Sequence, residues 1–111
     1  MSSENVVSFL LARPEYRKTL ELAVKEEEQH ANEQHYLGWQ WFGVETNPSK
    51  LMRLVTEGIA RVSFKSNSST NYMLKERSEV KIALSGLDKE IQRLRERGEV
   101  EAKRAAKRTT T

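Results

Sequence analysis

The hydrophobic positions in the first part of the chain recur at helical spacing. An apolar stretch between residues 4 and 12 predicts a short amphipathic helix, which Pro14 separates from the chain that follows. After the proline, Leu20, Ala23 and Val24 lie on one side of a second predicted helix, and the other side is polar. Two amphipathic helices are therefore expected before residue 30.

A further short helix is predicted after Gly43. Residues 46–48, Thr-Asn-Pro, supply an N-cap candidate and a proline just inside the first turn. The apolar positions that follow at helical spacing are Leu51, Leu54 and Val55. Gly58 then ends the helical pattern.

From Ile59 the hydrophobic period changes to two, which is the period of a half-buried strand. Val62 and Phe64 alternate with polar neighbours until the polar run of residues 66–71, and the alternation resumes at Tyr72. The pattern predicts two strands joined by a polar, mobile tip.

The order of helix, glycine, strand, polar tip and returning strand resembles the recognition helix and wing of a winged helix-turn-helix domain. The segments that carry the resemblance read NPSKLMRLVTEGIARVSFKS and NYML, and the likeness extends over about residues 37–74. It implies a mostly α fold with a small β-hairpin wing, in which residues 1–77 form the winged-helix domain with extra N-terminal helices. The commonest members of this family bind double-stranded DNA, so the resemblance also implies a transcriptional regulator with a recognition helix in the major groove.

Between the second helix and the expected recognition helix, the sequence HANEQHYLGWQWFGV leaves two questions open. Its tail takes the place of the first helix of the helix-turn-helix pair, but periodicity does not decide whether it continues the helix before it. Trp39 and Trp41 either fill the junction of the helices or form a stacking platform for unpaired bases. The acidic surroundings favour the core for at least one ring.

The C-terminal part is predicted to form a long helix that starts near Ser78. Its apolar seam, with alternating spacings of four and three residues, consists of Val80, Leu84, Leu87, Ile91 and Leu94. Such a narrow stripe predicts that residues 78–98 pair two copies of the chain in a homodimer, or alternatively that they pack back on the domain. Gly98 is expected to end the seam. Residues 99–111 form a basic tail that is either frayed or a further phosphate contact.

Composition narrows the class of protein. The chain has 111 residues, of which 37% are hydrophobic and 32% charged, so one modest core with much solvated helix surface is expected. The absence of cysteine from the sequence excludes disulfides, thiolate catalysis and the common structural zinc sites. The longest apolar run in the N-terminal region is far shorter than the roughly 20 residues of a membrane span. We therefore expect a cytoplasmic protein without membrane contact.

Charge is distributed unevenly along the chain. Residues 14–46 contain three basic and seven acidic side chains, whereas residues 47–81 contain seven basic and three acidic ones. The positive charge therefore coincides with the expected recognition helix and wing. Because neutralisation of phosphates supplies most non-specific affinity for DNA, this coincidence favours a DNA-binding function.

The residues expected to contact DNA lie at the start of the short helix, on its outward face and on the wing. They are Thr46, Asn47, Ser49, Lys50, Arg53, Arg61, Lys65 and Asn67. Within this set Lys50 and Arg53 are expected to enter the groove, since arginine can bind guanine edges with two hydrogen bonds. Arg61 and Lys65 on the wing are expected to contact phosphates or the minor groove.

No enzymatic activity, cofactor or metal site is expected. The sequence has no Gly-rich phosphate loop and no nucleophile elbow. Glu27 and His30 have a metal-ligand spacing, but the chain has only two histidines, and the acidic run of residues 26–28 is typical of a solvated helix face. The alternative function is a protein-interaction module, since winged-helix domains also serve as docking platforms and the acidic N-terminal surface suits a basic partner.

Overall fold

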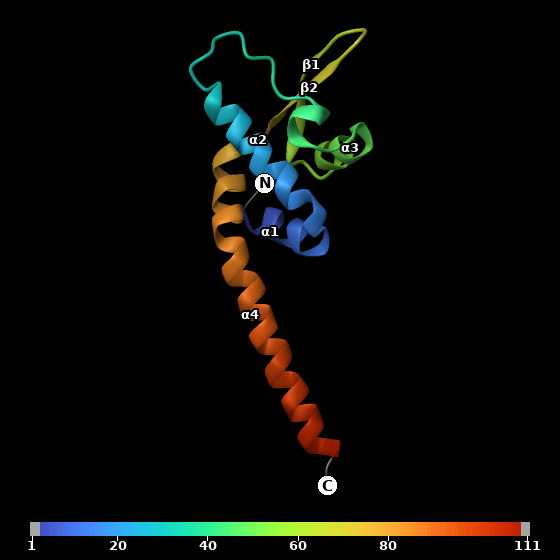
Figure 1. The fold of residues 1–111 in the computed structure, drawn as a ribbon, viewed down its shortest axis with the longest axis vertical. Helices are drawn as coiled ribbons and strands as arrows, with labels where there is room; N and C mark the ends of the chain where they lie inside the picture. The colour runs from blue at the N-terminus through green and yellow to red at the C-terminus, as the bar shows by residue number, and fades with distance from the viewer. Residues whose placement is uncertain (1–2, 110–111) are drawn as a thin grey trace.

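A computed structural model describes residues 3–109 of the chain, with side chains as far as Gly98. The fold is mostly helical, with a long C-terminal helix and, within the described residues, one two-stranded antiparallel sheet (Figure 1). In chain order the elements are α1 (Ser3–Ala12), the 3-10 helix η1 (Pro14–Tyr16), α2 (Arg17–Gln29), the 3-10 helix η2 (Trp41–Val44), α3 (Pro48–Thr56), β1 (Ala60–Lys65), β2 (Thr70–Leu74) and α4 (Arg77–Thr109). The expectation of a mostly α protein with a small β-hairpin and a long C-terminal helix is confirmed.

Helices α1 and α2 pack against the first half of α4, and the apolar sides of these three helices form about half of the core (Figure 1). The fully buried side chains of these three helices are Val6, Leu20, Ala23 and Val80, and Leu10, Ala83 and Leu87 are almost as deeply buried. At the surface, Arg17 at the start of α2 forms a two-bond pair with Asp88 of α4, at 2.8 and 3.0 Å. The apolar spacing of Leu20, Ala23 and Val24 therefore predicted the buried side of α2 correctly.

Helix α3 begins as its sequence predicts. The side-chain oxygen of Asn47 accepts a hydrogen bond from the backbone N–H of Lys50 at 2.9 Å, and Pro48 occupies the first helical turn. Leu51 and Leu54 are fully buried on the inner side of the helix. The capping residue and the two leucines thus fix both the start of α3 and its orientation in the domain.

The sheet contains a β-bulge that was not visible in the sequence. Arg61 pairs with Met73 and Val62 pairs with Tyr72, but the register shifts between Val62 and Phe64. A bulge sets two residues of one strand against one residue of the other. The side chains of β1 after the bulge therefore point to the opposite face from the one that a regular strand would give them. The bulge thus puts Val62 and Phe64 on opposite faces of the hairpin, and the expected regular alternation across the whole of β1 is wrong. Both side chains are exposed.

The segment between α2 and η2 does not continue α2, which ends at Gln29. Instead Trp39 forms an antiparallel bridge with Tyr72, with reciprocal backbone hydrogen bonds of 2.9 and 2.8 Å. The chain reaches this bridge through Gly38, whose φ of +112° lies in the region that favours glycine. A Cβ at Gly38 would lie 2.4 Å from the carbonyl oxygen of Tyr72. The tail of this segment forms the short 3-10 helix η2 where a regular helix was expected.

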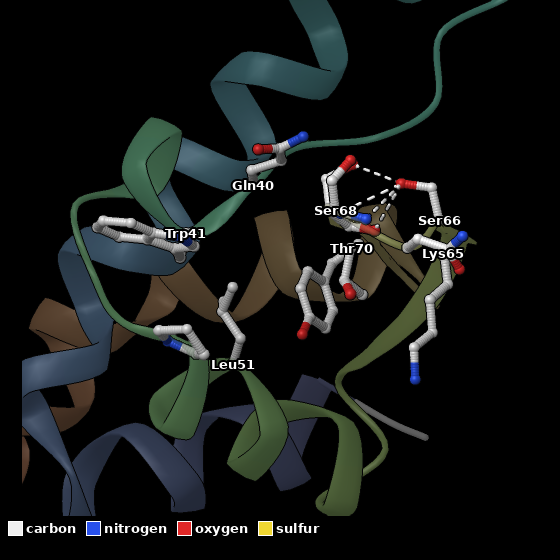
Figure 2. A pocket seen from close by; sticks show the side chains of 11 residues that line it. Gln40, Trp41, Leu51, Lys65, Ser66, Ser68 and Thr70 are labelled. Atoms are coloured by element: carbon white, nitrogen blue, oxygen red, sulfur yellow. Dashed lines mark hydrogen bonds between the residues drawn. The ribbon is translucent and has the colours of Figure 1, made fainter.

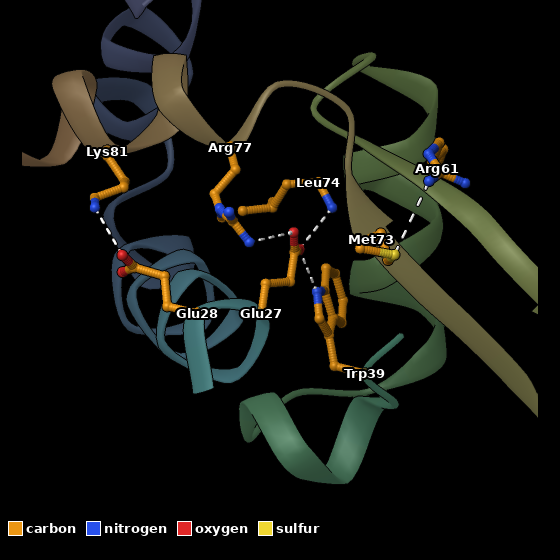
Figure 3. Close-up of polar contacts among 8 residues, drawn as sticks. All are labelled: Glu27, Glu28, Trp39, Arg61, Met73, Leu74, Arg77 and Lys81. Atoms are coloured by element: carbon orange, nitrogen blue, oxygen red, sulfur yellow. Dashed lines mark hydrogen bonds and ion pairs between the residues drawn. The ribbon is translucent and has the colours of Figure 1, made fainter. Parts of the chain in front are cut away.

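Glu27 is a core residue, so the expectation that residues 26–28 form a solvated face is wrong at this position. Its Oε2 accepts hydrogen bonds of 2.8 Å from the indole Nε1 of Trp39 and from the backbone N–H of Leu74 (Figure 3). Arg77 lies 4.0 Å from Oε1. The carboxylate of α2 thereby contacts the segment before η2 through Trp39, β2 through Leu74 and the start of α4 through Arg77.

Helix α4 continues through Gly98 to Thr109, so the predicted boundary between helix and tail at residue 98 is not a break in the helix. One glycine costs about 1 kcal/mol relative to alanine, and the neighbouring Arg, Glu, Ala and Lys residues are strong helix formers. The distal half of α4 projects from the domain, and the molecule measures 68 × 26 × 21 Å (Figure 1). The side chains of the expected basic tail, residues 99–111, lie outside the described residues.

Candidate nucleic-acid interface

Helix α3 presents one exposed face to solvent. Its members are Pro48, Ser49, Met52, Arg53 and Thr56, spaced at helical intervals opposite the buried leucines. Arg53 lies 3.6 Å from Glu57 in an ion pair one turn away, so the guanidinium is accessible but partly neutralised. Met52, 53% exposed, was not among the expected contacts, although the spacing of Ser49, Met52 and Thr56 would have identified it.

Two of the expected DNA contacts are directed toward the domain itself. The ammonium of Lys50 lies over the ring of Tyr16, 5.9 Å from its centroid, so this half-buried side chain packs along η1. The hydroxyl oxygen of Thr46 is buried and has no hydrogen-bond partner among the described residues. Neither group is presented outward as predicted, because the ammonium of Lys50 meets the Tyr16 ring and the folded chain covers the hydroxyl of Thr46.

A groove of about 350 Å³ separates the start of α3 from the wing, which is the β1–β2 hairpin with its tip (Figure 2). Its lining residues come from η2, α3 and the hairpin: Gln40, Trp41, Pro48, Leu51, Lys65, Ser66, Asn67, Ser68, Ser69, Thr70 and Tyr72. Lys65 and Asn67, which were expected to contact DNA, therefore line the same groove as the first turn of α3. The groove could not be predicted from the sequence, because the residues of its walls are far apart along the chain.

The two cationic wing residues lie on opposite faces of the hairpin. Lys65 lines the groove together with Tyr72, whereas Arg61 pairs with Met73, one position along, and its guanidinium lies 3.9 Å from that sulfur (Figure 3). Successive side chains of a strand point to opposite faces of a sheet, so in a regular strand Lys65 would lie on the same face as Arg61. The bulge moves Lys65 to the other face, which is the face of Tyr72. The structure therefore brings Lys65 to α3 and does not bring Arg61 there.

The wing tip is a hydrogen-bonded turn centred on Ser66. The backbone N–H of Ser66 donates to the carbonyl of Ser69 at 2.8 Å, and its hydroxyl oxygen accepts from the backbone N–H of Ser69 at 3.1 Å. Figure 2 shows the bonds of the Ser66 hydroxyl at the edge of the groove. The serines of this polar run thus shape the end of the wing and place Asn67 at its exposed turn.

The apolar seam of α4 is divided between the core and the surface. Val80 and Leu87 are buried by the chain's own helices, so their assignment to a contact between two copies is wrong. Leu84 and Ile91 are partly buried against the same core, and Leu94 is 39% exposed. The alternative that the first half of the seam packs back on the domain is therefore correct, because α1 and α2 cover it.

An apolar groove of about 270 Å³ remains beside the distal part of the seam. It is lined by Leu10, Leu11, Pro14, Arg17, Leu87, Ile91 and Leu94, which come from α1, η1, α2 and α4. At this groove the seam leaves the cover of the domain, since Leu94 lies where α4 begins to project.

His30 belongs to a polar cluster at the end of α2. Its Nδ1 lies 2.8 Å from Glu33 and its Nε2 lies 3.4 Å from Glu26, and its ring stacks on Tyr36 at 4.6 Å. The neighbouring carboxylates, Glu33 first, raise the pKa of His30, and burial raises the pKa of the Tyr36 hydroxyl. Glu27 does not belong to this cluster, since its carboxylate is bound to Trp39.

A cluster of metal ligands and a membrane-spanning helix are both absent from the described residues. They contain no group of three or more His, Cys, Asp or Glu side chains that could hold a metal ion. Within the same part of the chain, every helix is too short or too polar to cross a membrane.

A comparison of the chain with protein-family models, with curated proteins and with solved structures finds no significant match.

Proposed function

We propose that this chain is a winged helix-turn-helix protein that binds double-stranded DNA and regulates transcription as a homodimer. In this proposal α3 is the recognition helix, the β1–β2 hairpin is the wing, and η2 takes the position of the first helix of the pair. Arg53 and Ser49 contact base edges in the major groove, and Lys65 contacts a phosphate.

One observation supports the proposal: the first turn of α3 and Lys65 of the wing line the same groove. Ser49 and Arg53 are exposed on the helix, and Lys65 lines the groove to which Pro48 also belongs. Lys65 forms no ion pair among the described residues, so its charge is available to a phosphate. A duplex bound along α3 would therefore meet side chains able to read bases and a cation able to hold the backbone.

The experiment is fluorescence anisotropy of a labelled random duplex over a range of salt concentrations. The wild-type protein should lose affinity steeply with the logarithm of salt concentration, and Lys65→Ala should lower that slope by about one. Lys89→Ala, an exposed cation on α4, is the matched control and should leave the slope unchanged. Binding that is insensitive to salt, or an equal loss in both variants, would contradict the proposal.

Base reading is tested separately, by selection of preferred sequences from a random library. Arg53→Ala should relax the preference, because a good two-bond contact to guanine contributes about 1–3 kcal/mol of discrimination. Lys65→Ala should weaken all sequences alike. If both variants lose the same affinity on selected and random DNA, the roles given to the two residues are wrong.

We propose that the homodimer forms through the distal part of α4. Leu94 is 39% exposed and adjoins the apolar groove that also contains Ile91. The same helix offers a matched control, because Ile82 is also exposed but lines a different groove, between α1 and α4. In sedimentation at roughly tens of micromolar, Leu94→Lys should convert a dimer into a folded monomer and Ile82→Lys should not. A monomeric wild-type protein would refute the dimer.

The alternative function, a protein-docking module, has one observation in its favour. Phe42 on η2 is 64% exposed and does not line the groove. Exposed aromatic side chains are enriched at protein interfaces. A docking module would bind duplex DNA weakly and without a strong salt dependence, so the anisotropy experiment distinguishes the two functions.

A further inference from the structure

The fold gives the two neighbouring tryptophans different environments. Trp39 is 2% exposed and its Nε1 is bound to Glu27, so it is a core side chain. Trp41 is 46% exposed, lies on η2 and lines the groove beside the wing (Figure 2). Phe42 packs edge-on against it with the ring centroids 5.6 Å apart. The stacking alternative is therefore excluded for Trp39 and open for Trp41.

The groove combines an apolar wall with a polar, cationic wall. Trp41, Pro48, Leu51 and Tyr72 form the apolar part. The polar part consists of Gln40, Lys65, Thr70 and the wing tip, and none of the described lining residues is acidic. Its volume of about 350 Å³ falls within the roughly 300–1,000 Å³ of ligand pockets.

This pairing of walls restricts the chemistry of the ligand. An inorganic anion would neutralise Lys65 but would leave the Trp41 ring in water, and a hydrocarbon would desolvate Lys65 without a partner. A nucleotide carries a flat π-face with hydrogen-bonding edges together with a phosphate. Both parts of the groove would then be satisfied by one ligand, with the amide of Gln40 within the lining to meet a base edge.

We infer that the groove binds one unpaired nucleotide of a DNA strand, with its base against Trp41 and its phosphate at Lys65. The inference rests on the proposed DNA-binding function in one respect: Pro48 belongs to the groove and to the exposed face of α3, so a strand held along α3 reaches the groove. The position of Gln40 is already set, since its amide donates to Asn71 Oδ1 at 3.3 Å and Asn71 donates to the carbonyl of Gly38 at 2.9 Å.

The test compares DNAs that differ in one base. A short labelled duplex with one unpaired thymidine is compared with the same duplex carrying an abasic site at that position, and with the perfect duplex. The backbone charge of the two bulged DNAs is the same, so a difference between them reports the base alone. The thymidine bulge should bind about tenfold more tightly than the abasic bulge, because one base stacked on an aromatic side chain contributes about 1–3 kcal/mol.

The variants place the effect at Trp41. Trp41→Leu should abolish the difference between the two bulged DNAs, and Phe42→Leu, the neighbouring exposed aromatic, should preserve it. The melting curve of each variant shows that it is folded. Wild-type tryptophan fluorescence should change on binding of the thymidine bulge and of single-stranded oligothymidine, but this change should be absent in Trp41→Leu.

Each outcome separates this inference from the proposed function. Tight binding of the perfect duplex with equal affinity for the two bulged DNAs would overturn the groove inference and leave duplex binding intact. Failure to bind the perfect duplex, combined with a Trp41-dependent response to oligothymidine and not to an abasic strand, would support the groove and refute the duplex function. Equal responses to thymidine monophosphate and to oligothymidine would assign the site to a free nucleotide and overturn the inferred strand.

Discussion

Glu27 Oε2 accepts a hydrogen bond of 2.8 Å from the indole Nε1 of Trp39 in the core of the domain. The same oxygen accepts the backbone N–H of Leu74 at 2.8 Å, so one carboxylate holds the segment before η2 and the second strand of the wing. Trp39 in turn forms the backbone bridge to Tyr72, which lines the groove. The geometry of the candidate interface therefore depends on a contact in the core behind it.

We expect Glu27→Ala to destabilise the fold by about 3 kcal/mol, because it leaves the indole N–H and the Leu74 N–H buried without an acceptor. Urea denaturation measures the change. Glu28→Ala removes the neighbouring carboxylate, which forms an exposed ion pair of 2.8 Å with Lys81, and should have little effect. Similar losses in the two variants would show that the buried hydrogen bonds are not the cause.

Gly38→Ala should destabilise the protein by at least about 2 kcal/mol, because φ at this position is +112° and the new Cβ would meet the backbone oxygen of Tyr72. Gly43 provides the control, since a Cβ there meets no atom within 4 Å. Thermal melts of Gly38→Ala and Gly43→Ala compare the two. A Gly38→Ala protein as stable as the wild type would contradict the bridge between Trp39 and Tyr72.

Stability should depend on pH through His30. Glu33 and Glu26 raise its pKa above the ordinary value of 6.5, so the protonated ring stabilises the folded state. When the pKa of a group is raised in the folded state, its contribution to the free energy of unfolding is fully present below the unfolded pKa, here about 6.5. That contribution is lost as the pH rises through the pKa of His30 in the folded state. The difference in urea midpoint between wild type and His30→Gln should therefore shrink from pH 5.5 to above the folded pKa. A difference in urea midpoint that stays constant over this pH range would rule out the ion pairs of His30 as its source. The variant His35→Gln is the control for the loss of an exposed imidazole.

Leu87 and Leu94 should respond differently to truncation, although both belong to the same seam. Leu87→Ala should cost about 2–5 kcal/mol, because Leu87 is packed in the core of the single chain. Leu94→Ala should cost clearly less, since Leu94 is 39% exposed at the edge of the domain. Denaturation at concentrations where the protein is monomeric makes the comparison. Equal costs would show that Leu94 is also covered by the domain.

Removal of the Glu57 charge should strengthen duplex binding. Glu57 pairs with Arg53 at 3.6 Å, so Glu57→Gln frees the guanidinium and removes one negative charge from the interface. We expect a gain of roughly two- to fivefold in affinity, decreasing at higher salt. Glu21→Gln is the matched control, because Glu21 pairs with Arg17 at the same helical spacing on α2. Unchanged affinity in Glu57→Gln would remove Arg53 from the proposed interface.

The sequence by itself determined the parts of this protein that depend on local spacing. The apolar positions Leu20, Ala23 and Val24 predicted the buried side of α2, and Leu51 and Leu54 predicted that of α3. The residues before Pro48 predicted the cap that Asn47 forms. The change of period after Gly58 predicted the hairpin. Each of these features involves residues within a few positions of one another, so the local sequence contains the information that decides it.

Only the tertiary structure decided which side chains meet. Glu27 looks like its acidic neighbours in the sequence, and its burial depends on Trp39 and Leu74 lying opposite it. Likewise, the groove exists because η2, α3 and the wing converge, and Lys65 faces it because of a bulge. Helix α4 shows the same limit: its seam was visible, but α1 and α2 determined that Leu87 is buried and Leu94 is not. These contacts join segments far apart along the chain, and periodicity cannot specify which of the available apolar and polar surfaces will pair.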